Sequence, residues 1–188
     1  MDLEARIDRI ESVQAIQQLP IRYAMAVDGR DVDAWVELFV EDVDCGRYGN
    51  GRAALKSFIA PTLANFYRSV HLICGHKIDF DGSENATGAV YCRAEHEDKN
   101  QWVNMAICYF DTYARRDGKW YFVRRKERHW YAAEALERPH GPDFSNWPGQ
   151  DIPPASLPEA FPTWVQFWDA MDHDKQAART DYPVTASI

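Results

Sequence analysis

Residues 101–132 read QWVNMAICYFDTYARRDGKWYFVRRKERHWYA, and this stretch decides the fold. Two runs within it, 101–115 and 120–132, have the period of two that is typical of strands. Between the runs, Arg116-Asp117-Gly118-Lys119 contains the Asp-Gly pair that favours a tight two-residue turn. The stretch therefore predicts an antiparallel hairpin of two long strands.

The same period of two extends upstream of this hairpin. Residues 69–80 and 86–96 form two further strand patterns, separated by a turn at 81–85, and a second turn at 97–100 leads into the hairpin. Consecutive strands joined by such short turns pair in an antiparallel manner. The sequence therefore predicts a meander of four long strands.

The first third of the chain has a helical period instead. Residues 4–18 repeat apolar side chains at three- and four-residue steps, Pro20 interrupts the pattern, and residues 21–27 resume it. This predicts two helical segments with a kink, or a helix that restarts with Pro20 in its first turn, ending near Gly29. Helices followed by an antiparallel meander indicate the α+β class, with the helices packed on one face of the sheet. Two further helices are predicted over residues 34–40 and 52–66.

Residues 138–188 differ in composition from the rest of the chain. Prolines crowd the segment 139–162, aromatic residues lie among them, and one short amphipathic helix is predicted at about 162–171. A segment this aromatic is expected to cover the pocket or to pack on a neighbouring subunit, and only about the last dozen residues have the composition of a loosely held tail. We therefore divide the chain into a domain, residues 1–137, and a C-terminal extension, residues 138–188.

The bulk composition indicates a folded, acidic protein. The hydrophobic fraction is 46% and the formal net charge is −8, so a packed core is expected and nucleic acid is excluded as a partner. No apolar run approaches the roughly 18 residues of a membrane span, and the N-terminus lacks a signal-peptide core. The four cysteines show no Cys-x-x-Cys spacing and are expected to be buried free thiols. These features predict a cytoplasmic protein that has no membrane partner.

Two residues suggest acid/base chemistry. Asp28 falls at the end of the first helical pattern, and His71 falls at the start of the first strand pattern. A carboxylate that orients an imidazole forms a general acid/base unit near neutral pH and needs no metal. Tyr23 and His96 are placed so that they could join the pair. If these groups converge in one pocket, the protein is a small acid/base enzyme.

The chain resembles a known superfamily. The element order, the segment Val27-Asp-Gly-Arg-Asp31 with Trp35 and Leu38-Phe39 after it, and the strand that begins at His71 are similar to the SnoaL-like branch of the nuclear-transport-factor-2-like superfamily. The resemblance covers roughly residues 4–135. It implies a cone-shaped curved antiparallel sheet packed on the N-terminal helices, an α+β barrel with a deep apolar cavity. The superfamily includes lyases, isomerases, epoxide hydrolases, cyclases and non-catalytic partners, so the fold alone does not choose a function.

Individual positions extend the resemblance to two dehydratases of this branch, scytalone dehydratase and bile-acid 7α-dehydratase. Asp28 and His71 match the Asp–His pair of both enzymes, and Tyr23 resembles a tyrosine of the bile-acid enzyme. Tyr48 resembles a tyrosine that both enzymes carry, and His96 resembles the second histidine of scytalone dehydratase. The dehydrochlorinase of the branch carries a lysine in place of Tyr23, which argues against dehalogenation. The downstream serine and asparagine of scytalone dehydratase have no match here, which leaves the substrate open.

Each of these residues also has a purely structural interpretation. His71 could be an ordinary strand histidine, with Asp28 an unrelated carboxylate at a helix end. Tyr23 and Tyr48 could pack in the core, and His96 could lie at a solvent-facing turn. The proximity of Asp28 and His71 in the folded chain decides between the two interpretations.

Further substrate contacts are predicted from the strands. An inward-facing arginine among the last-strand residues Arg125, Arg128 and His129 could hold an anionic group, and at least two of the three are expected in surface or interface ion pairs. We assign Arg128 and His129 as substrate-binding candidates, together with Trp102 and Asn104. The six histidines show none of the close spacings of a metal motif, and no glycine-rich phosphate loop occurs, so neither a metal nor a cofactor is expected.

These observations lead to one functional prediction and two alternatives. Seven Trp and nine Tyr residues suit a pocket for a ring-shaped organic ligand. We predict a cofactor-independent lyase, a dehydratase acting on a hydrophobic cyclic substrate such as a polyketide, steroid or terpenoid. The alternatives are another acid/base reaction in the same cavity (isomerisation, cyclisation or epoxide opening) and a non-catalytic ligand-binding or assembly module. We expect a homo-oligomer, either a trimer or a dimer, because the meander leaves a broad sheet face.

Overall fold

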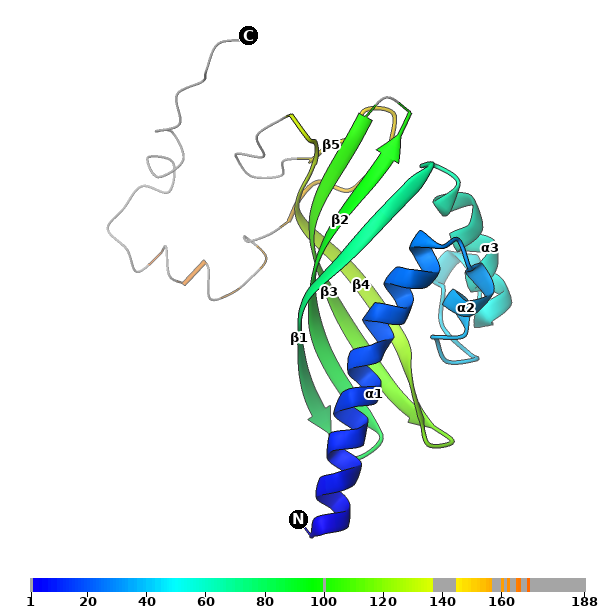
Figure 1. The fold of residues 1–188 in the computed structure, drawn as a ribbon, viewed down its shortest axis with the longest axis vertical. Helices are drawn as coiled ribbons and strands as arrows, with labels where there is room; N and C mark the ends of the chain where they lie inside the picture. The colour runs from blue at the N-terminus through cyan, green and yellow to red at the C-terminus, as the bar shows by residue number, and fades with distance from the viewer. Residues whose placement is uncertain are drawn as a thin grey trace.

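The computed structural model describes residues 2–99, 101–136 and 145–156, with single residues at 160, 162, 165, 166 and 169. Figure 1 shows helix α1 running along the curved sheet, with α2 and α3 beside its C-terminal end. In the described residues the helices are α1 (Leu3–Asp28), α2 (Val32–Val36), the 3-10 turn η1 (Gly46–Tyr48) and α3 (Gly51–Leu63). The strands are β1 (Arg68–Asp81), β2 (Asn85–Asp98), β3 (Gln101–Arg116), β4 (Lys119–Glu134) and β5 (Ser145–Asn146).

Helix α1 is longer and more continuous than the sequence pattern predicts. The Asp2 carboxylate caps it by accepting a hydrogen bond from the backbone N–H of Ala5 at 2.8 Å. Pro20 lies inside a single helix of 26 residues, so the helix is neither divided into two segments nor restarted at Pro20. Leu19 and Pro20 are both buried, and tertiary packing of this kind supplies most of the stability of a helix. This packing therefore offsets the loss of the one backbone hydrogen bond that proline cannot make.

The four long strands form an antiparallel meander in the order β1-β2-β3-β4, and β5 adds in parallel to β4. The β3–β4 turn contains Asp117 and Gly118 with φ of 51° and 77°, the positive values that a type I′ turn requires. The hairpin predicted from the Asp-Gly pair is therefore confirmed. Register shifts after Ile73, Ala106 and Thr112 mark irregularities that bend the strands, and the sheet is curved without closing (Figure 1).

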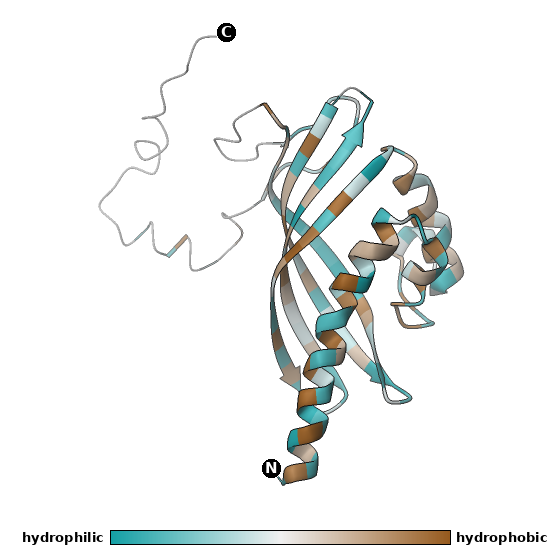
Figure 2. Cartoon of the chain, in the orientation of Figure 1, coloured by the Kyte–Doolittle hydropathy of each residue, from teal (hydrophilic) through white to brown (hydrophobic). Residues whose placement is uncertain are grey.

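Alternation along the strands divides the side chains between an inner face, which meets α1, and an outer face. The ring of Tyr23 in α1 packs against Tyr109 of β3 and Phe122 of β4, so those two residues define the inner face. Residues two apart in a strand share a face, which places Met105 and Ile107 with Tyr109. Figure 2 shows hydrophobic and hydrophilic residues interspersed along the strands. The inner face therefore carries the core that the helices cover.

The predicted elements and the observed ones agree closely within the domain. The α+β class, the curved sheet packed on N-terminal helices and all four long strands are confirmed, with ends that differ by at most two residues. The second helix lies earlier than predicted, because Asp31 caps it by accepting from Ala34 N at 2.9 Å. The predicted helix at 162–171 lies mainly outside the described residues. No helix in the described part of the chain is long and apolar enough to cross a membrane.

The expectation of four buried thiols is wrong in part. Cys92 and Cys108 are buried, Cys45 is half-buried, and Cys74 is exposed; all four are free. Cys74 lies next to the irregularity between Ile73 and Gly75 of β1, where the alternation that would bury a side chain is broken.

Candidate active site

The carboxylate of Asp28 and the imidazole of His71 are in direct contact. His71 Nδ1 lies 2.7 Å from Asp28 Oδ1, and the backbone N–H of His71 donates to Asp28 Oδ2 at 2.8 Å. A third donor, the hydroxyl of Ser69, reaches Asp28 Oδ1 at 2.8 Å. Asp28 is the last residue of α1 and His71 stands near the start of β1, so the packing of this helix end on this strand brings the two residues together.

These contacts set the charge and the tautomer of the pair. Burial alone would raise the pKa of Asp28, but the hydrogen bonds and the charge of His71, with the Ser69 hydroxyl, outweigh it and hold the pKa below its usual value. Asp28 is therefore a carboxylate that can only accept. The neutral imidazole then carries its proton on Nδ1, which leaves Nε2 as the free basic nitrogen. The side chain of His71 is 7% exposed and that of Asp28 is 23% exposed, so the pair is shielded from bulk water.

His96 of β2 stands next to His71, edge to face, with ring centroids 5.6 Å apart. It is 5% exposed, and its ring also packs on Phe66 at 4.7 Å and on Trp147 of the extension at 4.9 Å. Burial, with a smaller contribution from the charge of His71, lowers the pKa of His96 to about 3. His96 is therefore buried and neutral, which contradicts its interpretation as a residue of a solvent-facing turn.

A second polar group, formed by Tyr23 and Arg125, lies on the N-terminal side of Asp28 along α1. Tyr23 precedes Asp28 by five residues, about 7.5 Å along the helix axis. The guanidinium of Arg125 stacks on three rings, at 4.4 Å from the ring of Tyr23, 4.3 Å from that of Tyr109 and 4.4 Å from that of Phe122. Burial raises the pKa of Tyr23 to about 12 despite the positive charge of Arg125, so the phenol stays protonated.

Arg125 is held by a buried carboxylate. Its Nε and Nη2 donate to the two oxygens of Asp111 at 2.9 and 2.7 Å, with the two side chains 4% and 0% exposed. Tyr113 Oη also donates to Asp111, at 2.8 Å. The third nitrogen, Arg125 Nη1, is buried and has no hydrogen-bond partner among the described residues. Arg125 therefore offers the two N–H donors of Nη1 and a positive charge beside Tyr23.

Tyr48 does not join the pair. It is 47% exposed in η1, where its hydroxyl accepts from Arg47 at 2.7 Å and its ring packs on Phe58 at 4.9 Å. Tyr48 lines a pocket of about 250 Å³ together with Phe58 and Arg125, and neither Asp28 nor His71 lines it. The proposed match to the dehydratase tyrosine is therefore not supported by its position.

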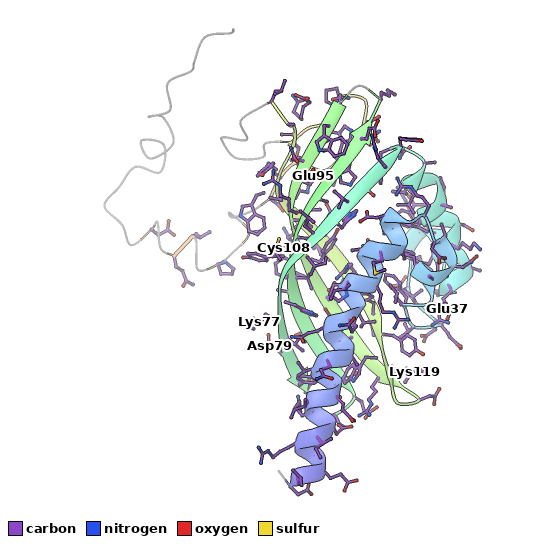
Figure 3. The ribbon with its side chains drawn as sticks, in the orientation of Figure 1. Glu37, Lys77, Asp79, Glu95, Cys108 and Lys119 are labelled. Atoms are coloured by element: carbon purple, nitrogen blue, oxygen red, sulfur yellow. The ribbon has the colours of Figure 1, made fainter. Side chains whose placement is uncertain are left out.

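The remaining predicted substrate contacts also lie away from the pair. Trp102 alternates with the inner-face residues and donates its Nε1–H to Glu95 at 2.9 Å (Glu95 is labelled in Figure 3). Asn104 shares that outer face by alternation. Arg128 bonds Ser156 of the extension at 3.3 Å and His129 contacts Ser145 at 2.9 Å, so both hold the extension.

Sequence reasoning missed several residues around the pair. Asp111 interrupts an apolar run in β3, and a charged residue in such a run is a signal that it has a buried partner. Ser69 and Arg30 carry no such signal, because their contacts depend on how the end of α1 meets β1. Trp147 could be recognised only as one aromatic residue among many in the extension. Within the described residues, no group of three or more His, Cys, Asp or Glu side chains is placed to hold a metal ion.

Comparisons with known proteins find one matching family model and several similar proteins. A family model described as SnoaL-like domain matches residues 8–126. Gamma-hexachlorocyclohexane dehydrochlorinase of Sphingobium indicum is 27% identical over 126 residues, which cover 63% of this chain and 81% of that protein. The crystal structure of LinA has a TM-score of 0.64 at 23% identity and covers 73% of this chain and 98% of that one. A protein of Novosphingobium aromaticivorans assigned as a scytalone dehydratase has a TM-score of 0.62 at 24% identity. The match covers 78% of this chain and 99% of that one.

Proposed function

Because this chain belongs to the SnoaL-like domain family, we propose that it is a cofactor-independent lyase whose Asp28–His71 pair removes water from a hydrophobic cyclic substrate. The observation that carries the proposal is the 2.7 Å contact between His71 Nδ1 and Asp28 Oδ1. It leaves Nε2 of a shielded histidine free to take a proton. One relative of this chain is a dehydrochlorinase, so chloride is the alternative leaving group to water.

The first step of the proposed reaction is proton abstraction. His71 Nε2 takes a proton from the carbon next to a substrate carbonyl, and the C–H electron pair moves into the carbonyl system. The imidazolium that forms is stabilised by the Asp28 carboxylate, whose pKa lies below its usual range, so that the pair stays ionic. The second step breaks the C–O bond to the departing hydroxyl, which takes the same proton back from His71. A C=C bond and one water molecule are the products, and His71 returns to its starting state.

Tyr23 and Arg125 are suited to the oxygen on which negative charge develops. The phenol of Tyr23, with a pKa of about 12, donates a hydrogen bond without losing its proton. Arg125 adds positive charge and the free Nη1–H beside it. This cluster lies about 7.5 Å from Asp28 along the axis of α1. The substrate would span the distance between the two, with its carbonyl at Tyr23 and its acidic carbon at His71.

His96 completes the apolar wall next to the base. A neutral imidazole beside His71 does not repel the imidazolium that forms on His71, and its buried Nδ1 lacks a partner among the described residues. We propose that this nitrogen makes one hydrogen bond to the substrate. The neighbouring inner-face side chains are apolar, which suits a hydrophobic ring system. They are Val90, Cys92, Ala94, Val103, Met105, Ile107 and Tyr109.

The described part of the extension is proposed to cover the inner sheet face beside His96. Trp147 is buried against His96, and its Nε1–H donates to the buried carboxylate of Asp98 at 2.6 Å. Gln150 donates to the same oxygen at 3.1 Å. Since Asp98 lies at the end of β2, these bonds fix the extension across the strand that carries His96. This cover would exclude water from the base.

We also propose that the chain forms a homo-oligomer in the cytoplasm. Tyr91 and Trp130 pack together on the outer sheet face at 5.2 Å, and Leu72 and Tyr91 are both 48% exposed. An apolar face of this kind suits contact with a second copy of the chain, so a dimer or trimer is proposed. The four free thiols are consistent with a reducing cytoplasm.

Product analysis tests the leaving group. The purified protein is incubated with cyclic β-hydroxyketones of one to four fused rings, with scytalone and with gamma-hexachlorocyclohexane, and the products are analysed by mass spectrometry. Loss of water from a hydroxyketone, abolished in His71→Gln, supports the proposal. Release of chloride without any dehydration, or turnover without a change in mass, contradicts it in favour of a dehydrochlorinase or an isomerase.

A further inference from the structure

Arg30 occupies an unusual position at the end of α1. The backbone N–H groups of Arg30 and Asp31 donate to Val27 O at 3.1 Å and Ala26 O at 2.8 Å, the two bonds of a Schellman motif. In this motif the residue after the cap takes a left-handed conformation, usually as glycine. Here that residue is Arg30, with φ of 58°, although Gly29 is its neighbour. A left-handed non-glycine residue costs roughly 1–2 kcal/mol, so a compensating role of the side chain is expected.

The guanidinium of Arg30 joins the end of α1 to the chain that enters β1. Its Nη1 donates to Val27 O at 2.7 Å, and its Nη2 donates to Phe66 O at 3.0 Å and to Tyr67 O at 3.3 Å. A positive charge at this end of a helix also interacts favourably with the helix dipole. These contacts fix the spacing between the two elements that carry Asp28 and His71.

The same guanidinium reaches the catalytic pair through one hydroxyl. Arg30 Nη1 lies 3.2 Å from Ser69 Oγ, and Ser69 Oγ lies 2.8 Å from Asp28 Oδ1. Arginine can only donate, so it uses a lone pair of the serine and leaves the single serine proton for Asp28. Asp28 Oδ1 is also the atom that faces His71 Nδ1. The direction of every hydrogen bond from Arg30 to His71 is therefore determined.

We propose that Arg30 and Ser69 are positioning residues, which hold the Asp28 carboxylate so that His71 carries its proton on Nδ1 and keeps Nε2 free. The proposal rests on the proposed function for its catalytic consequence, but the tautomer of His71 is a property of the folded protein alone. Neither residue touches the reacting atoms. A purely structural role would tie α1 to β1 without affecting the tautomer.

Nitrogen-15 NMR of the histidine side chains of the full chain measures the tautomer directly. The resonances of His71, one of six histidines, are assigned by their loss in His71→Gln. Wild type is expected to show a protonated Nδ1 and an unprotonated Nε2. Ser69→Ala and Arg30→Gly are expected to shift the major form to the one that free histidine favours, with the proton on Nε2. Ser69→Thr, which keeps the hydroxyl, is expected to retain the wild-type form.

Arg30→Gly is a useful variant because glycine suits the left-handed backbone, so the fold should survive the loss of the guanidinium. Asp117→Gly is the matched control, since it relieves a left-handed residue (φ 51°) in the distant β3–β4 turn. In a lyase assay, kcat of Ser69→Ala and of Arg30→Gly is expected to fall about tenfold with little change in KM, equivalent to about 1.4 kcal/mol. Asp117→Gly should leave both constants unchanged.

The outcomes separate this proposal from the proposed function. A wild-type tautomer in both Ser69→Ala and Arg30→Gly overturns the positioning role, whatever the activity. A tautomer shift in a protein that dehydrates none of the cyclic β-hydroxyketones supports the positioning role and contradicts the proposed reaction. A shift together with the tenfold loss of kcat supports both.

Discussion

Asp28 and His71 are joined twice, once through the imidazole Nδ1 at 2.7 Å and once through the backbone N–H of His71 at 2.8 Å. The two oxygens of one carboxylate therefore fix both the ring and the strand that carries it. The backbone bond ties the start of β1 to the end of α1 independently of the ring. The proposed chemistry depends on this double link.

Replacement of Asp28 by Asn is expected to abolish most of the activity while the protein stays folded. The amide can donate to Nδ1, which favours the tautomer with the proton on Nε2 and removes the base. We expect kcat to fall by a factor of about 10³–10⁴, as is typical of such a change in a carboxylate–histidine pair. Steady-state kinetics measure the loss, and circular dichroism checks the fold. An Asp28→Asn variant with kcat within about tenfold of wild type would contradict this role of the carboxylate.

The buried His96 predicts how stability depends on pH. Its pKa is lowered to about 3 in the folded state, against about 6.5 in the unfolded chain, so between these values the unfolded state binds the extra proton. Stability from this residue is therefore complete above about pH 6.5 and is lost as the pH falls, by about 1.4 kcal/mol per pH unit.

Urea unfolding of wild type and His96→Gln between pH 7 and pH 4 measures this difference. The variant lacks the titrating group, so the gap between the two free energies of unfolding should change steeply below pH 6.5. Parallel curves would show that His96 is protonated in the fold or exposed to solvent.

The Arg125–Asp111 pair is expected to matter for stability as well as for the site. Asp111→Ala leaves a buried guanidinium without its carboxylate, which should cost about 3–5 kcal/mol in the free energy of unfolding. The exposed Lys77–Asp79 pair, whose residues are labelled in Figure 3, is the control, and Asp79→Ala should cost less than about 1 kcal/mol. Urea denaturation measures both variants. Equal small losses would mean that Arg125 finds another partner or leaves the interior.

Trp147 tests whether the extension covers the site beside His96. Trp147→Phe keeps an aromatic ring against His96 but removes the donor to the buried Asp98, so a loss of about 1–3 kcal/mol is expected. Trp147→Ala also opens the space beside His96 and should raise KM for the cyclic substrate more than it changes kcat. Urea denaturation and steady-state kinetics measure these effects. Unchanged stability and KM in Trp147→Ala would show that the extension is not part of the site.

The fold of the domain could be predicted from local patterns. The alternation in 101–132 and the Asp117-Gly118 turn predict the hairpin, because side-chain period and turn chemistry act over a few residues. The parallel pairing of β5 with β4 was not predictable, since it involves two residues brought back over a long connection. The rule that proline interrupts a helix fails at Pro20, because the burial of this residue outweighs the local preference.

The site was predictable only in part, and the residues show why. Asp28 and His71 are both chemically distinctive, and the family resemblance gives a reason for them to meet. The sequence favours Trp102 and Asn104 as substrate contacts, but they lie on the outer face, because the sheet curvature that decides the face is not visible in the sequence. Ser69 and Arg30 act through hydrogen bonds to neighbouring groups, and a serine at a strand start or an arginine after a helix end carries no sign of such a role.

The most direct test of the proposed reaction is the rate of water elimination by His71→Gln compared with wild type, on whichever cyclic β-hydroxyketone the wild type converts. Glutamine keeps the polar character of the side chain but cannot accept and return a proton at Nε2. We predict that both proteins are equally folded and that the variant is slower by a factor of at least about 10³. A folded His71→Gln variant that dehydrates the substrate at the wild-type rate would contradict the assignment of Asp28 and His71 as the catalytic pair.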